Sequence, residues 1–311
     1  MSAHWFSEQA SSFSGELLFC EKLAKYTWYR IGGEAQVLAI PKTLDDLKWL
    51  AQGIEATGLP HFIMGAGSNL LISDSGFPGV VIKVSKLNLE LAAISGAHQV
   101  RLGTSVMISS FLRRAAQEGW GGLELLTGIP GTVGGAVAMN AGTHLGETKD
   151  RLVRVDAFSL TEKNPILRSF EKEQLHFSYR KNSFLEEGML VYATVWQYLA
   201  EDPVTVKAKI DETLARRKAT QPIDYPSCGS VFKNPLEKKI SAWQVIDQLG
   251  LRGHRLGGAQ ISEMHSNFII NLGGALARDV YGLITLIKAR ALSEMGVEMH
   301  EEVKYLGQFL P

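Results

Sequence analysis

A serine, an arginine and a glutamate, each in a short polar segment, are of types that could donate a proton or bind an anion or other ligand. Ser230 lies in the segment Pro-Ser-Cys-Gly-Ser-Val-Phe-Lys-Asn-Pro, residues 226–235. A nucleophile elbow needs a glycine two residues before the serine, and Cys228 occupies that position, so acyl transfer finds no support. The hydroxyl could instead donate a proton or bind a ligand. A β-turn with a surface lysine, Lys233, explains the segment equally well.

Arg180 and Glu302 stand in the two other segments. Arg180 follows Phe-Ser-Tyr at residues 177–179 and could pair bidentately with a carboxylate or phosphate, although a solvated loop is the simpler explanation. Glu302 follows Glu301 in a strand-like segment, where alternation puts the two side chains on opposite faces. An inward carboxylate is costly unless it has a partner. A solvated acidic pair is the alternative.

Glycine clusters mark places where backbone amides could hold an anion. Of 311 residues, 31 are glycine, above the usual ~7%, and the excess lies largely at residues 31–33, 65–70 and 128–142. Without a Cβ atom, successive N–H groups can converge on phosphate oxygens. One such loop would be read as a turn. Two long loops that also carry small polar residues favour a pyrophosphate cradle; these residues are Ser68, Asn69, Thr132 and Asn140.

Other nucleotide and metal sites lack support. The loop at 65–70 reads Gly-Ala-Gly-Ser-Asn-Leu, with Leu70 where a dinucleotide fingerprint has its third glycine, and no long helix is predicted after it. There is no GxxxxGK[ST] sequence. The eight histidines form no HExxH motif or close pair at metal-ligand spacing. His265 could line a site, but packing or a helix start would explain it as well.

Short β-like runs and amphipathic helices must position these side chains. Up to about residue 85 we predict a βαββ-like unit: a strand at 37–40, a helix capped by Thr43, and strands at 61–64 and 80–84. From 87 to 201 we predict further strands at 87–92, 99–103, 152–160 and 189–199, with a helix at 108–119. The polar stretch before Pro203 is the candidate boundary. Helices at 205–218, 243–249 and 278–295 and a last strand at 297–306 follow. The plan is α+β in three parts.

Charge and cysteine content exclude several classes of protein. Lys+Arg 32 and Asp+Glu 32 give a formal net charge of zero, which argues against a protein that coats nucleic acid or anionic lipid. Cys20 and Cys228 cannot make a disulfide framework or a cysteine-based zinc site. There is no signal-peptide pattern, and no apolar run approaches the ~18–20 residues that span a bilayer. We expect a cytoplasmic monomer without nucleic-acid or membrane partners.

Six segments, in this order, resemble the UDP-N-acetylenolpyruvoylglucosamine reductases, flavoenzymes of bacterial peptidoglycan synthesis. They are Tyr-Arg-Ile-Gly-Gly (29–33), the loop at 65–70, Gly-Ile-Pro-Gly-Thr-Val-Gly-Gly (128–135) with Asn-Ala-Gly (140–142), Tyr-Arg (179–180), Gly-Ser-Val-Phe-Lys-Asn (229–234) and Glu-Val (302–303). The resemblance covers most of the chain. It corresponds to the shorter subgroup, which lacks an extra tyrosine-bearing loop, so the residue that caps the substrate diphosphate stays open.

The resemblance implies a flavin-binding fold of the vanillyl-alcohol-oxidase type in two subdomains and a C-terminal substrate-binding domain. The subdomains would be residues 1–85, to which 303–311 return, and 86–201; residues 202–302 would bind substrate. FAD would lie between the first two, and NADPH and the sugar nucleotide would use one site in turn. The implied cofactor contacts are Gly65, Ala66, Gly67, Ser68, Asn69, Leu70, Gly131, Thr132, Gly134, Gly135, Asn140 and Ala141.

The resemblance also implies roles for the polar side chains. Hydride would pass from NADPH to the flavin N5 and then to the enolpyruvyl methylene carbon, and Ser230 matches the donor that protonates the resulting carbanion. Arg180 and Glu302 match residues that polarise the carboxylate and stabilise the enolate-like intermediate; a protonated Glu302 would need a raised pKa. The implied substrate contacts are Tyr179, Lys233, Asn234, Arg252 and Lys304. The zero net charge would then conceal a local positive site facing a diphosphate.

Two other functions stay open at this stage. An FAD-dependent oxidase of the same fold could act on an alcohol or sugar, and a flavin- or nucleotide-binding protein could lack redox turnover. The absence of histidine from the loop at 65–70 favours non-covalent flavin. The presence together of Arg180, Ser230 and Glu302 speaks against a protein without turnover.

Overall fold

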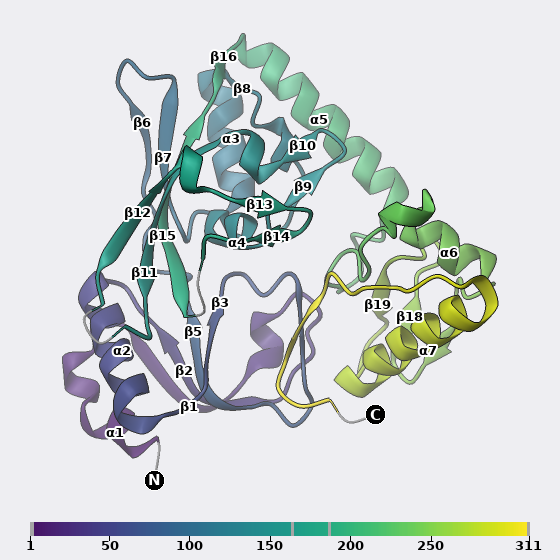
Figure 1. The fold of residues 1–311 in the computed structure, drawn as a ribbon, viewed down its shortest axis with the longest axis horizontal. Coiled ribbons are helices and arrows are strands. Elements are labelled where there is room, and N and C mark those ends of the chain that lie inside the picture. Colours follow the sequence, from purple (N-terminus) through teal and green to yellow (C-terminus); the bar gives the residue numbers. More distant parts are fainter. Residues whose placement is uncertain (1–2, 163–164, 186–187, 310–311) are drawn as a thin grey trace. The chain divides into compact units, whose positions relative to one another are not determined.

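A computed structural model describes residues 3–162, 165–185 and 188–309 of the chain (Figure 1). The chain forms two compact units that interleave along the sequence. Unit 1 consists of Met1–Cys20, Gln36–Ala66 and Gly79–Ala215, and unit 2 consists of Glu21–Ala35, Gly67–Pro78 and Arg216–Pro311. The division into three domains at residues 85, 201 and 302 stays a prediction.

A four-stranded sheet and the helix α2 form the first layer of unit 1. The sheet has the order β1-β2-β5-β3, and β3 is parallel to β5. Its strands are β1 (Glu16–Lys22), β2 (Glu34–Ile40), β3 (His61–Met64) and β5 (Phe77–Lys83). Thr43 and Asp46 form a capping box at the start of α2 (Leu44–Thr57), as the sequence predicts for Thr43. The apolar face of α2 packs with buried strand residues and with α1 (His4–Glu8).

A five-stranded antiparallel sheet forms the second layer of unit 1, in the order β12-β11-β15-β7-β6. The strands are β6 (Leu91–Ile94), β7 (Gln99–Gly103), β11 (Leu152–Ser159), β12 (Leu167–Glu171) and β15 (Met189–Gln197). The helices α3 (Ile108–Glu118) and α4 (Val133–Ala138) share a core with this sheet, in which Phe111 contacts the fully buried Trp196. The sequence predicted β7 and α3 correctly.

Short paired strands present the polar segments of unit 1. β9 (Gly142–Thr143) pairs with β10 (Gly146–Glu147), and β13 (Phe177–Ser178) pairs with β14 (Lys181–Asn182). β14 lies against α4, as Figure 1 also shows. β8 (Trp120–Gly121) pairs with β16 (Leu199–Ala200), which precedes α5 (Pro203–Thr220).

Unit 2 has its own apolar core between the helices α6 (Ala242–Gln248) and α7 (Ala277–Met295) and a three-stranded sheet. The sheet has the order β17-β18-β19, formed by Arg255–Leu256, Ala259–Ile261 and Ile269–Asn271. Separately, β4 (Leu70–Ile72) runs parallel to β20 (Lys304–Leu306). Asp74 accepts hydrogen bonds from the first backbone amides of α7, at Ala277 (2.8 Å) and Arg278 (3.0 Å), where a carboxylate stabilises the helix dipole.

Several predicted elements have other bounds in the structure, and three of them are instructive. The last strand is only Lys304–Leu306 rather than 297–306, because residues 297–303 cross unit 2 with isolated contacts instead of a ladder. The strand predicted at 87–92 is displaced to Leu91–Ile94, where it pairs with β7. The helix predicted from 205 begins at Pro203, since proline has no N–H to lose in the first turn of a helix.

Candidate active site

Two of the glycine segments approach each other in unit 1, at Gly65 and the start of α4. A Cβ atom on Gly65 would lie 2.9 Å from the Thr132 hydroxyl oxygen, and one on Gly134 would lie 2.1 Å from the hydroxyl oxygen of Thr104. Thr132 in turn accepts a hydrogen bond from the Gly135 amide at 3.3 Å. A side chain at either glycine would therefore collide with its neighbour. This bare backbone fits a cofactor that must approach the main chain closely.

Asn140 is a buried residue near the end of the glycine segment at 128–142. It is fully buried, has a positive φ of 42°, and its amide nitrogen donates to Glu147 Oε2 and to the Ser178 carbonyl, both at 3.0 Å. Its side-chain oxygen accepts from the Lys149 amide at 3.2 Å. The side chain thus fixes the course of the loop, while the cofactor contacts predicted for Asn140, Gly131 and Ala141 stay predictions.

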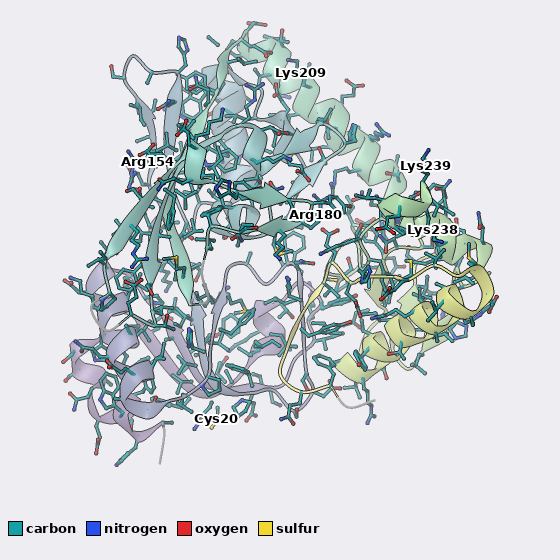
Figure 2. All side chains as sticks on the ribbon, in the orientation of Figure 1. Cys20, Arg154, Arg180, Lys209, Lys238 and Lys239 are labelled. Carbon is teal, nitrogen blue, oxygen red and sulfur yellow. The ribbon has the colours of Figure 1, made fainter. Side chains whose placement is uncertain are left out.

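Arg180 lies at the turn between β13 and β14, with a positive φ of 56° (Figure 2). Its Nη2 donates to the carbonyl oxygen of Gly142 at 3.0 Å, its Nη1 lies 3.8 Å from Glu147 Oε1, and its guanidinium carbon lies 5.0 Å from the centre of the Tyr179 ring. The side chain is only 16% exposed. A non-glycine residue in the left-handed region costs free energy and is concentrated at functional sites. Residues 177–182 therefore form an ordered β-hairpin and not a solvated loop.

Glu147 is a site residue that the sequence analysis missed. Besides Arg180 and Asn140, its carboxylate contacts the Lys149 ammonium at 3.2 Å, and its own side chain is 20% exposed. The carboxylate therefore joins the glycine segment to the hairpin that carries Arg180. Local sequence pattern could not reveal this, since Glu147 lies between a histidine-containing turn and a lysine and resembles an ordinary surface residue.

Lys83 is a second residue that the sequence analysis missed. It ends β5, it is half-buried, and its ammonium donates to the carbonyl oxygen of Gly65 at 3.1 Å. Burial lowers the pKa of Lys83 below the ordinary value for lysine. The sequence pattern gave no signal for it, because a lysine at the end of a strand is usually solvated.

Residues 67–70 of the glycine loop at 65–70 belong to unit 2, and hydrogen bonds connect them to the segment that carries Glu302. Gly67 has a positive φ of 68°, and a Cβ atom there would lie 2.4 Å from the Tyr26 carbonyl oxygen. The Asn69 amide donates to the Glu302 carbonyl oxygen at 3.0 Å, and the Lys304 amide donates back to the Asn69 carbonyl at the same distance. The predicted cofactor contacts of Ser68, Asn69 and Leu70 stay predictions.

Backbone hydrogen bonds bring Ser230 and Glu302 into one place in unit 2. The Glu302 amide donates to the Val231 carbonyl oxygen at 2.8 Å, directly after Ser230 in the chain. Ser230 itself forms an antiparallel bridge with Phe268. Both Ser230 and Glu302 are half-buried. Glu301 contacts the Lys288 ammonium at 2.7 Å, and the opposite orientation of Glu302 stays a prediction.

Asn267 holds the serine segment in position. It is a buried amide whose oxygen accepts from the Phe232 backbone N–H at 3.0 Å and whose nitrogen donates to the Phe232 carbonyl at 2.9 Å. Its own carbonyl accepts from the Val231 amide at 2.8 Å. The Asn267 side chain therefore forms with Phe232 the two main-chain hydrogen bonds that a neighbouring strand would otherwise provide. Nothing in the local sequence distinguishes it from a loop asparagine.

Cys228 is not a nucleophile of this site. The thiol is buried in the core of unit 2, and burial raises its pKa to about 12, so the thiolate is scarcely populated at neutral pH. Burial likewise raises the pKa of the fully buried Tyr29. Cys20 is exposed, and both cysteines are free thiols.

Two predicted substrate contacts of unit 2, Asn234 and Arg252, have partners in the protein. The Asn234 side-chain oxygen accepts from the Ala242 amide at 3.0 Å and so caps the start of α6. Arg252 makes a forked pair with Asp247, with Nε to Oδ1 at 3.1 Å, and also contacts the Glu263 carbonyl. The side chain of Lys233 is half-buried and that of Lys304 is exposed. Their substrate contacts stay predictions, as does that of Tyr179.

His265 lies near the Arg252–Asp247 pair. Its ring packs edge-on against Phe268, and its Nδ1 atom is buried without a hydrogen-bond partner. Burial lowers its pKa and so favours the neutral imidazole. No group of three or more His, Cys, Asp or Glu residues in the described ranges could hold a metal ion.

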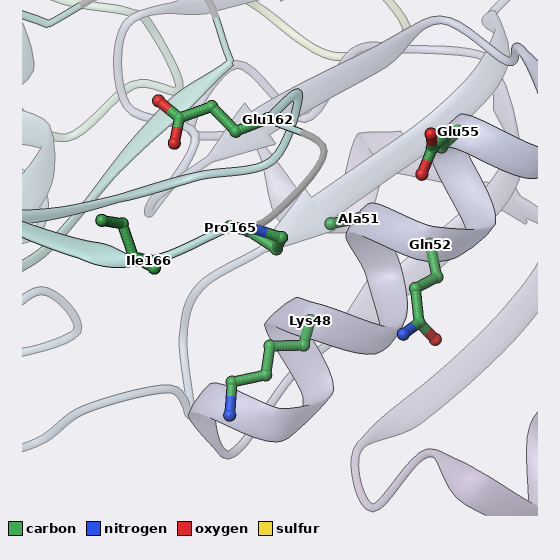
Figure 3. A pocket seen from close by; sticks show the side chains of 7 residues that line it. All are labelled: Lys48, Ala51, Gln52, Glu55, Glu162, Pro165 and Ile166. Atoms are coloured by element: carbon green, nitrogen blue, oxygen red, sulfur yellow. The ribbon is translucent and has the colours of Figure 1, made fainter.

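A surface pocket elsewhere in unit 1 contains none of the predicted site residues. It has a volume of about 270 Å³ and is lined by Lys48, Ala51, Gln52, Glu55, Glu162, Pro165 and Ile166. Figure 3 shows the polar side chains of α2 on one side and Glu162 on the other. We assign no function to it. Among the described residues, no helix has the length and apolar character needed to cross a membrane.

Comparison with known proteins first gives the class of this protein. The family model of an FAD binding domain matches residues 35–161, which contain Gly65, Lys83, Thr132 and Asn140. The chain therefore has the α+β, vanillyl-alcohol-oxidase type of flavin-binding fold with a further C-terminal α+β region. The predicted fold class and FAD cofactor are confirmed.

The family follows from the rest of the chain. The model of the C-terminal domain of UDP-N-acetylenolpyruvoylglucosamine reductase matches residues 221–306. The reductase of Synechococcus sp. (strain WH7803) is 41% identical over 92% of this chain and 91% of its own, and that of Geobacter metallireducens is 37% identical over 99% and 100%. The crystal structure of the Thermus caldophilus reductase has a TM-score of 0.76 at 34% identity, over 94% of this chain and 99% of its own.

The chain therefore belongs to the UDP-N-acetylenolpyruvoylglucosamine reductase family. As a member, it is an FAD-dependent oxidoreductase that takes its hydride from NADPH. The bare backbone at Gly65, Gly67 and Gly134 is consistent with that cofactor. The expectations of a monomer and of a cytoplasmic location stay predictions.

Proposed function

We propose that this chain reduces the enolpyruvyl group of UDP-N-acetylenolpyruvoylglucosamine, giving UDP-N-acetylmuramate, with Ser230 as the proton donor. Bound FAD supplies the hydride that it receives from NADPH. The single observation that supports the role of Ser230 is the backbone hydrogen bond from Glu302 to Val231, which holds Glu302 beside the Ser230 segment. An acid and a second polar group at one place are what protonation of a carbanion next to a carboxylate needs.

Ser230 would hold the proton that the substrate carbon takes up, and solvent would restore it after turnover. The overall balance is one hydride from NADPH to the methylene carbon and one proton to the carbon beside the carboxylate. A serine hydroxyl is a weak acid, so its proton transfer depends on stabilisation of the charge that develops. Lys233, which follows three residues later and is half-buried, is a candidate for that stabilisation.

Arg180 would bind the substrate carboxylate. Its planar fork suits a carboxylate, and its contacts with the Gly142 carbonyl, Glu147 and the Tyr179 ring hold the guanidinium in one orientation. Glu302 would donate a hydrogen bond to the enolate-like oxygen when protonated. Each of these groups would stabilise negative charge as it develops on the substrate.

The first test separates flavin reduction from substrate turnover. In Ser230→Ala, bleaching of the flavin by NADPH should proceed at the wild-type rate, while reoxidation by the enolpyruvyl sugar nucleotide without oxygen should fall by at least ~10²-fold, the usual contribution of a positioned acid. Ser227→Ala, three residues earlier, is the matched control. Wild-type turnover in Ser230→Ala would remove the serine from the mechanism. A wild-type protein that oxygen reoxidises faster than the sugar nucleotide does would identify an oxidase instead.

A further inference from the structure

The ammonium group of Lys83 lies at the first residue of the glycine loop. Its Nζ donates to the Gly65 carbonyl oxygen at 3.1 Å. The parallel pairing of β5 with β3 places Lys83 opposite Met64, one residue before Gly65, and the Val84 amide donates to the Met64 carbonyl at 3.0 Å. The strand ladder thus sets the position of the lysine relative to the loop, because a change of register would break these bonds.

Lys83 is an exception in an apolar strand. Val80, Val81 and Ile82 are fully buried and Val84 is 3% exposed. Ile82 and Val84 belong to the core that packs with α2, so alternation directs Lys83 to the opposite face of the strand. A half-buried ammonium carries a desolvation cost, which a nearby anion offsets. Lys83 is half-buried at the end of this strand, where an anion bound beside it would lower that cost.

The same glycine has a second polar neighbour in unit 1. The Thr132 hydroxyl oxygen lies 2.9 Å from where a Cβ atom of Gly65 would stand. A cation and a hydroxyl therefore flank a bare stretch of backbone, the combination that binds phosphate oxygens. All three residues lie within residues 35–161, which match the FAD binding domain.

We propose that Lys83 is a cofactor-binding residue whose ammonium neutralises part of the charge of the FAD diphosphate at Gly65. The diphosphate is the anionic part of FAD that a bare glycine loop accommodates, and a lysine binds phosphate as a compact point charge. The hydrogen bond to Gly65 orients the ammonium toward the loop. The lysine thereby adds a charge to a cradle that otherwise consists of backbone and hydroxyl groups.

The test measures release of FAD from the purified holoprotein on dilution, by flavin fluorescence, for three variants. Lys83→Met removes charge and donor, and Lys83→Gln keeps a donor for the Gly65 carbonyl. Both should raise the Kd for FAD about tenfold, the loss expected for one charge-assisted hydrogen bond. Lys86→Met is the matched control. This exposed lysine lies three residues after Lys83 and pairs with Glu16, so its replacement should leave the Kd unchanged.

A second measurement locates the lysine on the cofactor. Riboflavin, which has no diphosphate, should bind the flavin-free full chain equally well in wild type, Lys83→Met and Lys83→Gln. Unchanged FAD affinity in a variant whose circular dichroism and melting temperature match wild type would overturn the proposal. Equal losses of FAD and riboflavin affinity would overturn it as well, because they would place the charge at the flavin ring or in the fold. If Lys83→Met does not fold, Lys83→Gln decides.

Discussion

The two units hold their functional side chains in opposite ways. In unit 1, Arg180 is oriented by side-chain and carbonyl contacts with Glu147, Tyr179 and Gly142, at a turn with a strained backbone. In unit 2, Ser230 and Glu302 are placed by main-chain hydrogen bonds through Val231. One arrangement depends on the partners of a single guanidinium, and the other depends on the fold of the surrounding chain.

This difference predicts different consequences of mutation. Replacing a side-chain partner changes the orientation of one group, and the free energy of unfolding hardly changes when the partner is near the surface. Removing a buried group that supports main-chain hydrogen bonds leaves donors and acceptors unsatisfied, which costs stability directly. Substitutions around Arg180 should therefore act on activity, and those around Ser230 should act on folding first.

The largest expected effect is on stability in unit 2. Asn267→Ala should lower the free energy of unfolding by about 3 kcal/mol, because it leaves the amide and carbonyl of Phe232 unsatisfied and creates a small cavity. Asn182→Ala is the control in unit 1, where the amide also bonds main chain, at Ala138 and Leu185, but is half-buried; it should cost about 1 kcal/mol. Urea denaturation followed by circular dichroism measures both, and equal losses would contradict the contrast.

The next largest effect is on catalysis in unit 1. Arg180→Lys should lower kcat/KM for the sugar nucleotide about 100-fold, since an ammonium replaces a forked guanidinium by a point charge. The melting temperature and the rate of flavin reduction by NADPH should stay at the wild-type values. Lys181→Ala, at the exposed neighbouring position, serves as the control. A drop in melting temperature that accounts for the loss of activity would make the role of Arg180 structural.

A smaller effect is expected from the partner of Arg180. Glu147→Gln keeps the size of the side chain and its bond to the Asn140 amide but removes the charge near the guanidinium, so kcat should fall about tenfold through misorientation of Arg180. Flavin reduction by NADPH should be unaffected. Glu118→Gln, which breaks an exposed pair with Arg114 on α3, is the control. A changed rate of flavin reduction would show that Glu147 acts elsewhere.

The smallest effect concerns a carboxylate of unit 1 that acts only on stability. Burial opposes ionisation of Asp46, but hydrogen bonds from Lys42, Ser14 and Thr43 outweigh it and lower its pKa. Its contribution is therefore complete above the pKa of the unfolded state, near 3.9, and is lost as the pH falls through the lower folded-state pKa. Asp46→Asn should cost about 1 kcal/mol at pH 7 and nothing once the pH is well below the folded-state pKa.

The control for this pH dependence is the adjacent carboxylate. Asp45→Asn removes an exposed side chain that pairs with Lys48 at 2.7 Å, and surface pairs contribute little. It should leave the free energy of unfolding within about 0.5 kcal/mol of wild type at pH 7. Thermal unfolding of the two variants from pH 2 to pH 7 measures the difference. A constant effect of Asp46→Asn across that range would rule out a charge-dependent role.

Local pattern predicted the elements of this fold that have strong periodicity. The strands at 61–64 and 99–103 have the predicted bounds, and the helix predicted at 108–119 ends at Glu118, followed by Gly119 with a positive φ of 71°. The strand at 297–306 was overestimated because alternating apolar residues also occur in extended chain without a partner. The sequence analysis interpreted Pro203 as part of a domain boundary, although proline is also common at the first position of a helix, where the structure places it.

The amino-acid sequence by itself determined the types and order of the chemical groups. It identified the glycine loops, Arg180, Ser230 and Glu302, and with them the flavin cofactor and the family, because these depend on short motifs whose residues are adjacent in the chain. The contacts that position them were decided by the tertiary structure alone. Asn69 meets Glu302 across 233 residues, and Lys83 meets Gly65 through a parallel strand. Such pairings arise when separate elements pack together, and no local periodicity encodes them.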